Sequence, residues 1–235
     1  MTAAGQSREV DALVLATADD EMMMGHQWSE WICVAPFLEE DLAVCSIGQD
    51  ELGHAQALYS LLTDDVDRLA LRRAPGDYRS GWLCELATPA WEDALARHFL
   101  YDLGEEERWL ALADSDPDRL GGLAAQAQRE ERYHRTHAVS MVERLADPGT
   151  ASRARLLDAI DRLVPLAAAQ FDDLPAAYPR FRTTVDAVLD GCGHSMRWPA
   201  EPPTGQGRAG VRSSHFEALQ RRLNAVVDLD PSATW

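Results

Sequence analysis

The sequence contains no lysine. All 22 of its basic residues are arginine, against 39 acidic residues, and the formal net charge is −17. A chain this negative is repelled by nucleic acid and by anionic membrane surfaces, so we expect neither as a partner. Four arginines near the end of the chain fit either phosphate and carboxylate recognition or a solvated helix face. They are Arg208, Arg212, Arg221 and Arg222.

Long apolar runs and paired cysteines are also missing. No run reaches the roughly 18 apolar residues that a membrane-spanning helix needs, and the first residues lack the apolar stretch of a signal peptide, which predicts a cytoplasmic protein. No CxxC pair occurs among the four cysteines, so neither a disulfide framework nor a cysteine zinc site is predicted. No flavin, haem or iron–sulfur motif is visible.

Strand patterns are absent, and apolar residues recur instead at the intervals of three and four that are typical of helices. Four long helices are predicted. The first runs over about 8–34 with Ser7 as N-cap, and the second follows Pro36. The third begins at about Thr88, and the fourth begins at Pro117 with Asp116 as its cap. Two short-turn hairpins joined by one long crossover predict an all-α, ferritin-like four-helix bundle.

The rest of the chain predicts additions to this bundle rather than a second domain. Helices are expected over about 151–171 and 183–192, and a last one after Ser213. We therefore expect a single domain over 1–235, with the bundle at about 8–146 and a helical extension at about 150–235.

Two Glu-x-x-His pairs interrupt the apolar faces of the second and fourth helices. They are Glu51/His54 and Glu131/His134. A single pair of this kind on a helix is more typical of a surface than of a metal site. Whether these pairs are surface residues or metal ligands therefore depends on their heights in the bundle.

An acidic residue on each partner helix lies level with each pair. Glu21 and Glu51 are 30 residues apart with Pro36 midway, and Asp102 and Glu131 are 29 apart around the second turn. Residues equally far from a hairpin turn lie at the same height, here about 22 Å from the turn at 1.5 Å per residue. All six groups are therefore expected at one level of the bundle core.

Four carboxylates and two imidazoles in a core cannot stay ionised without cations. Two bridged iron ions resolve this, as in di-iron carboxylate bundles. Manganese is the alternative metal, whereas zinc prefers four ligands and fewer carboxylates. The predicted metal ligands are Glu21, Glu51, His54, Asp102, Glu131 and His134.

Neighbouring residues leave alternatives open. A small helix rotation would bring in Asp50 or Glu130 as ligands, and Glu106, beside Glu105 near the same face, is the rival of Asp102. His98 fits a ligand, a hydrogen-bond partner of a ligand, or a packed core histidine.

Other side chains around the predicted site have two interpretations each. Tyr133 and His137 fit either a structural role or the orientation of ligands. The tryptophans fit either core packing or an electron path; they are Trp28, Trp31, Trp91 and Trp109.

At these residues the chain also resembles a known family. The segments "SEWICVAPFLEED", "YHRTHA", "GRAGVRSSHFEALQ" and "PSATW" resemble the smaller, C-type subunit of the phenylacetyl-CoA epoxidase (phenylacetic acid catabolism) family. The resemblance implies a ferritin-like fold and a structural partner of an A-type subunit, whose di-iron site epoxidises the aromatic ring of a CoA thioester. It also implies a degenerate site in the C-type subunit. This sequence departs from that pattern at Glu21, Glu51, His54 and Glu131.

The leading hypothesis is therefore a non-haem di-iron oxygenase that inserts one atom of O2 into a small-molecule substrate. The resemblance implies an aromatic acyl-CoA thioester as that substrate. A separate reductase must supply electrons, and a homodimer or a heterodimer with a related subunit is expected. The rival hypotheses are a non-catalytic structural subunit and an iron-storage or peroxide-consuming protein.

Overall fold

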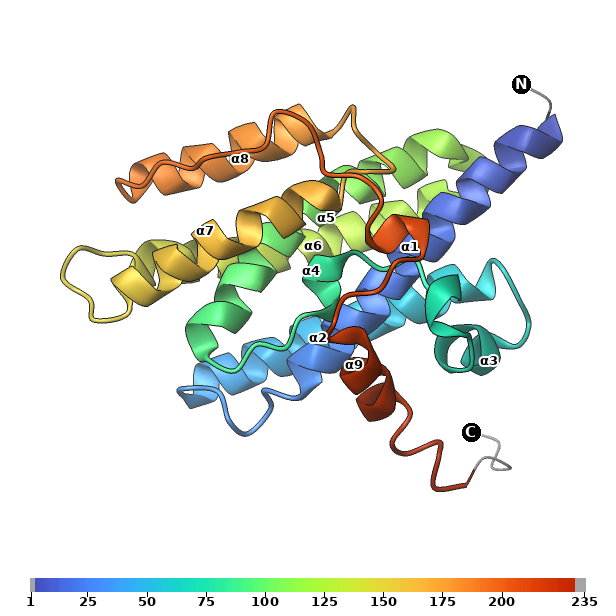
Figure 1. Ribbon diagram of the computed structural model, residues 1–235, viewed down its shortest axis with the longest axis horizontal. Coiled ribbons are helices and arrows are strands. Elements are labelled where there is room, and N and C mark those ends of the chain that lie inside the picture. The colour runs from blue at the N-terminus through green and yellow to red at the C-terminus, as the bar shows by residue number, and fades with distance from the viewer. Residues whose placement is uncertain (1–2, 231–235) are drawn as a thin grey trace.

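A computed structural model describes residues 3–230 (Figure 1). Over these residues the chain is helical, with no strand, and has the predicted ferritin-like bundle architecture. The bundle helices are α1 (Ala3–Ser29), α2 (Leu38–Ser60), α5 (Trp91–Ser115) and α6 (Pro117–Leu145). None of the described helices is long and apolar enough to cross a membrane.

The α1–α2 hairpin is held close by two glycines. A Cβ atom on Gly25 would lie 2.9 Å from the carbonyl oxygen of Gly48 and 2.9 Å from the Cβ of Glu51. A side chain at position 25 would therefore push α2 away. The absence of one lets the two backbones approach at the height of Glu51.

The first helix is shifted from the prediction. It begins at Ala3 and ends at Ser29, so Ser7 lies inside it and is not its N-cap. Ala3 and Ala4 are strong helix formers and extend the helix before position 7. After Ser29 the chain turns through Cys33, whose φ of 68° is incompatible with a continuing helix.

The second hairpin follows the prediction more closely. Asp116 caps α6, its side chain accepting a hydrogen bond from the Arg119 N–H at 3.2 Å, and Pro117 is the first helical residue. Helix α5 begins at Trp91 rather than Thr88. Pro89 and the extended Ala90 delay its start.

The long crossover contains short helices that the sequence pattern did not indicate, α3 (Val66–Leu71), the 3-10 turn η1 (Pro75–Asp77) and α4 (Trp82–Glu85). The extension forms α7 (Arg153–Ala169), α8 (Tyr178–Gly191), η2 (Gly207–Ala209) and α9 (Phe216–Leu223). Helix α8 begins five residues earlier than predicted, because Pro179 in its first turn starts the helix rather than breaking it. Figure 1 shows α7 and α8 along the α5 side of the bundle, and α9 beside α1 and α2.

The core has two parts. A large cluster fills the bundle and the space under the extension. A smaller one lies near the α1–α2 turn and consists of Trp28, Val44, Ile47 and Ala94, with Trp31 and Trp91 packed against it.

Candidate metal centre

The four bundle helices bring the six predicted ligands into the interior. All six are buried, with at most 4% of any residue exposed. They are Glu21 on α1, Glu51 and His54 on α2, Asp102 on α5, and Glu131 and His134 on α6.

His54 points one ring nitrogen into a group of carboxylates. Its Nδ1 lies 3.3 Å from Glu21 Oε2 and 3.4 Å from Glu131 Oε1. Its Nε2 lies 2.8 Å from Glu130 Oε2, close enough to donate its proton there. That tautomer leaves a lone pair on Nδ1, facing two carboxylate oxygens.

His134 repeats the arrangement from the other hairpin. Its Nδ1 lies 3.1 Å from Glu131 Oε2 and 3.9 Å from Glu51 Oε1. Its Nε2 lies 3.2 Å from Asp50 Oδ2. In both histidines Nδ1 therefore points inward, and Nε2 contacts a carboxylate from the opposite hairpin.

Asp50 and Glu130 therefore lie outside the centre of the cluster. Their side chains are 35% and 32% exposed, and they hold His134 and His54 respectively. A carboxylate on the outer nitrogen of a ligating histidine fixes its tautomer and ring orientation. Asp50 and Glu130 lie at the outer nitrogens of the two histidines, as such a carboxylate does.

Helix α5 contributes a carboxylate that the sequence analysis did not choose. An oxygen of Glu105 lies within 4.8 Å of ligand atoms of Glu21, Glu51 and His54. Glu105 Oε1 also accepts a hydrogen bond from the Trp109 Nε1–H at 2.9 Å. Glu105 was visible on the inward face of the predicted helix. Asp102, one turn earlier, was the predicted ligand because it is level with Glu131 across the turn.

Asp102 lies one turn from Glu105, beside His98. Its Oδ1 is 2.9 Å from His98 Nδ1, but that nitrogen already accepts a hydrogen bond from Trp28 Nε1–H at 2.9 Å. The lone pair of that nitrogen is therefore already used, and neither Asp102 oxygen has a hydrogen-bond partner within the described residues. Ligand atoms of Glu51, His98 and Asp102 lie within 4.8 Å of one another. Burial raises the pKa of Asp102 well above its usual range, and the charge of Glu131 adds to the shift.

The remaining candidates lie farther out. Glu106 is half exposed and pairs with Arg135. Tyr133 is 51% exposed, and its ring centroid is 6.3 Å from that of His134. His137 lies 3.0 Å from Glu40 Oε2.

Burial shifts the pKa values of the central acids in one direction. It raises the pKa of Glu21 and Glu51 well above the usual range, and the charge of Glu105 raises both further. Burial also raises the pKa of Glu105 and of Glu131 to about 7. The fold therefore places together acids that lose their protons with difficulty unless a cation joins them.

Several oxygens of these acids have no hydrogen-bond partner within the described residues. They are Glu21 Oε1, both oxygens of Glu51, Glu105 Oε2 and Glu131 Oε1. Orphaned buried oxygens beside two inward imidazole lone pairs fit metal ions. Four carboxylates and two imidazoles are the donor set of di-iron bundles, and they suit iron or manganese better than zinc.

A narrow cavity joins this cluster to the surface between α5 and α6. Its volume is about 120 Å³, and its walls include Asp102, Glu106, Glu131 and Arg135. Binding sites for drug-sized ligands occupy about 300–1,000 Å³. The cavity therefore fits O2 or water, and an aryl thioester would need it to widen.

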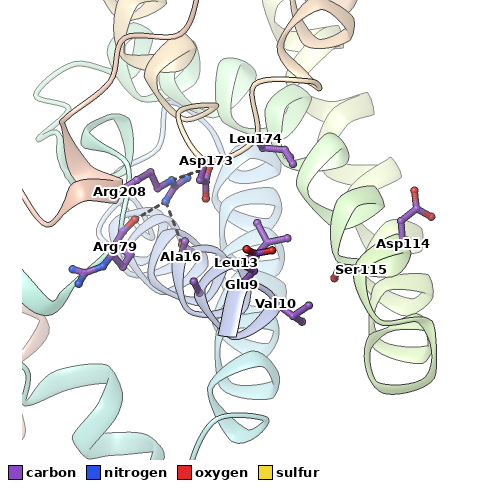
Figure 2. Close-up of a pocket in the computed structure, with 11 residues that line it drawn as sticks. Glu9, Val10, Leu13, Ala16, Arg79, Asp114, Ser115, Asp173, Leu174 and Arg208 are labelled. Atoms are coloured by element: carbon purple, nitrogen blue, oxygen red, sulfur yellow. Dashed lines mark hydrogen bonds and ion pairs between the residues drawn. The ribbon is translucent and has the colours of Figure 1, made fainter. Parts of the chain in front are cut away.

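A larger cavity lies elsewhere. It measures about 600 Å³ and is lined by the start of α1, the end of α5 and the loop at Asp173 (Figure 2). None of its lining residues belongs to the carboxylate cluster. Figure 2 shows Arg208 directed toward Asp173, Ala16 and Arg79. Its guanidinium forms an ion pair with Asp173 and donates hydrogen bonds to the backbone carbonyls of Ala16 and Arg79.

Comparison with known proteins gives a family and a relative. The family described as "Phenylacetic acid catabolic protein" matches residues 1–235. The C-type subunit of 1,2-phenylacetyl-CoA epoxidase from Escherichia coli (strain K12) is 29% identical over 169 residues, which cover 70% of this chain and 68% of the relative.

Proposed function

The chain belongs to the phenylacetic acid catabolic protein family, and from that premise we propose that it is a non-haem di-iron oxygenase inserting one atom of O2 into an organic substrate. One observation carries the proposal. Two histidine Nδ1 atoms and four buried glutamates converge, and no arginine within residues 3–230 pairs with these glutamates. A scaffold subunit needs no such costly arrangement.

The residues divide into ligands and groups that hold ligands. His54 and His134 would bind one metal ion each through Nδ1. Glu131 lies within 3.4 Å of both and is the best bridging carboxylate, with Glu51 as the second.

Two further acids would complete the site. Glu21 and Glu105 would be terminal ligands, with Glu105 taking the α5 position for which the sequence favoured Asp102. Two iron ions bound there would supply the electrons that reduce O2. The protein fixes the ligands, and Asp102 is a buried acid beside them whose pKa burial raises well above its usual range.

The proposed substrate class is taken from the relative, which is named as a subunit of 1,2-phenylacetyl-CoA epoxidase. We propose an aromatic acyl-CoA thioester, reached through the cavity between α5 and α6 after it widens. Electrons would come from a separate reductase. A related subunit or a second copy would complete the assembly.

The test is reconstitution of the metal-free protein with ferrous iron under nitrogen, followed by O2, a chemical electron donor and phenylacetyl-CoA or benzoyl-CoA. Oxygen uptake coupled to an oxygenated thioester, and lost in Glu51→Ala and His134→Ala, is the expected result. The exposed control Glu39→Gln should behave as the parent protein does.

The second candidate function is a non-catalytic subunit that pairs with a catalytic di-iron subunit. The name of the relative as a subunit favours it. Failure of the parent protein to retain iron, or no oxygenated product from a fully loaded protein, would support this candidate against the oxygenase. Full iron loading of both Glu51→Ala and His134→Ala would instead contradict the ligand assignment.

A further inference from the structure

A row of aromatic rings connects the carboxylate cluster to the surface near the α1–α2 turn. His98 lies beside Asp102 at the cluster, and its ring centroid is 4.4 Å from that of Trp28. The ring centroids of Trp28 and Trp91 are 6.0 Å apart, and those of Trp91 and Trp31 are 5.2 Å apart. No gap in this row exceeds ordinary aromatic packing distances.

From this row we propose that Trp28, Trp91 and Trp31 form a one-electron relay between the buried cluster and the surface. Indoles are among the side chains most easily oxidised by one electron, and close rings exchange electrons readily. Packing alone would explain a tryptophan core. It does not explain why the row starts beside buried Asp102 and ends at a surface cavity.

The inner end has a proton acceptor. An indole that loses one electron becomes a strong acid at Nε1. Trp28 Nε1–H already donates to His98 Nδ1 at 2.9 Å, so that nitrogen accepts the hydrogen bond through its lone pair. The proton can move to His98 as the electron leaves and return when Trp28 is reduced.

The outer end is accessible. Trp31 lines a surface cavity of about 360 Å³, together with Glu30, Val34 and Arg222. A small one-electron reductant, such as ascorbate, fits there. In the balanced sequence an oxidised metal ion held at the cluster, which the proposed function would supply, would accept one electron from Trp28 and be reduced by one unit. Trp91 would then reduce Trp28, Trp31 would reduce Trp91, and the external reductant would give up one electron to restore Trp31.

The three indoles meet in one small cluster, in which Trp28 is buried and against which Trp31 and Trp91 pack. Trp91 also packs against the large core. The relay as a physical path does not depend on bound iron. Only its use in oxygen chemistry rests on the proposed function, so the two can fail independently.

The relay can be tested in the full-length, metal-free protein. Cys33 is exposed and lies two residues from Trp31, so a thiol-reactive photo-oxidant can be attached there in a Cys45→Ser, Cys192→Ser background. A light flash makes the label take one electron from Trp31. Transient absorption then follows the tryptophan radical until the electron returns from the reduced label.

The relay predicts a long-lived phase in the labelled parent, because the radical moves inward to Trp28 and loses its Nε1 proton to His98. Trp91→Phe keeps an aromatic ring but interrupts the path, so this phase should be lost. Trp31→Phe, at the surface, should greatly reduce its amplitude. Trp198→Phe, which removes an indole packed on α8, should leave it unchanged.

The controls make the result decisive. Circular dichroism and melting temperature identify any variant that fails to fold, and Trp31→Phe remains informative if Trp91→Phe is unfolded. A parent without the long-lived phase, or folded variants at positions 31 and 91 that both retain it, would overturn the relay. Neither outcome would bear on metal binding.

Discussion

Three consecutive acids of α1 have opposite surroundings, although all are fully buried. Asp20 receives hydrogen bonds from Arg208 at 2.9 Å and from the Gly81 N–H at 2.7 Å. Asp19 pairs with Arg73. Glu21, the next residue, has histidine and other acids around it, and one of its oxygens has no partner among the described residues.

The presence or absence of an arginine partner separates two kinds of buried carboxylate. One kind stabilises the fold through ion pairs, and the other kind has no cationic side chain beside it. Arginines from the crossover and the extension form ion pairs with the first kind. Arg212, for example, donates a hydrogen bond from Nη1 to Glu85 Oε1 at 2.7 Å. Such pairs tie distant segments to the bundle. The second kind pairs with no arginine of the described chain, so its charge must be balanced by protons or by metal ions.

The largest effect is expected where an arginine-paired acid loses its partner. Arg208→Met would leave buried Asp20 with only the more distant Arg108, whose Nε lies 4.0 Å away, at a cost of about 3 kcal/mol in the free energy of unfolding. Urea denaturation of the metal-free protein measures it. Arg221→Met, whose side chain is 72% exposed, serves as the control and should change nothing measurable. A decrease of less than about 1 kcal/mol in the free energy of unfolding, as is typical of surface ion pairs, would mean that this pair does not stabilise the fold.

The metal-free cluster should make stability fall as pH rises. Glu105 and Glu131 have folded pKa values of about 7, above the unfolded value near 4.5, so the folded state binds more protons between these pH values. Each group would remove on the order of 3 kcal/mol across this window. Denaturation at pH 5 and pH 7.5 measures the effect, and Glu131→Gln should reduce it. A metal-free protein that is more stable at pH 7.5 than at pH 5 would contradict these raised pKa values.

Removal of a histidine-orienting acid should have a smaller effect. Asp50→Asn would weaken the hold on His134, so ferrous affinity should fall by about 10- to 100-fold. Anaerobic titration measures it. Glu39→Gln, an exposed acid on the same helix, is the matched control, and equal affinities of the two variants would assign Asp50 no role at the centre.

The smallest effect is expected at the surface. Glu106 and Arg135 form a half-exposed pair, so Glu106→Gln should cost under about 1 kcal/mol and leave iron content unchanged. Glu105→Gln, one residue earlier, should lower the iron content. The opposite result would return the α5 ligand to Glu106.

The sequence predicted the bundle and the inward faces because periodicity and turn chemistry are local signals. Pro117 after Asp116 marks a helix start without any knowledge of the fold. It could not weigh Asp102 against Glu105 on α5, which are three residues or about 4.5 Å apart along the helix. Glu105 lies within reach of Glu21, Glu51 and His54, and Asp102 within reach of Glu51 and His98, and these distances depend on packing.

The arginine partners of Asp19 and Asp20 were likewise beyond the sequence. Arg208 lies 188 residues from Asp20, and no periodic pattern links them. The late arginines were expected to recognise phosphate or to cover a solvated face. Arg208 and Arg212 instead neutralise buried acids, which is a consequence of how the extension folds back.

The most direct measurement of the central claim is an anaerobic ferrous titration of the metal-free protein at pH 6.5, with proton release recorded alongside. The account predicts saturation at two iron ions per chain and protons released from the cluster as the metal binds. It also predicts that saturation is lost in Glu51→Ala. Absence of saturable binding in the parent, or unchanged stoichiometry in Glu51→Ala, would contradict it.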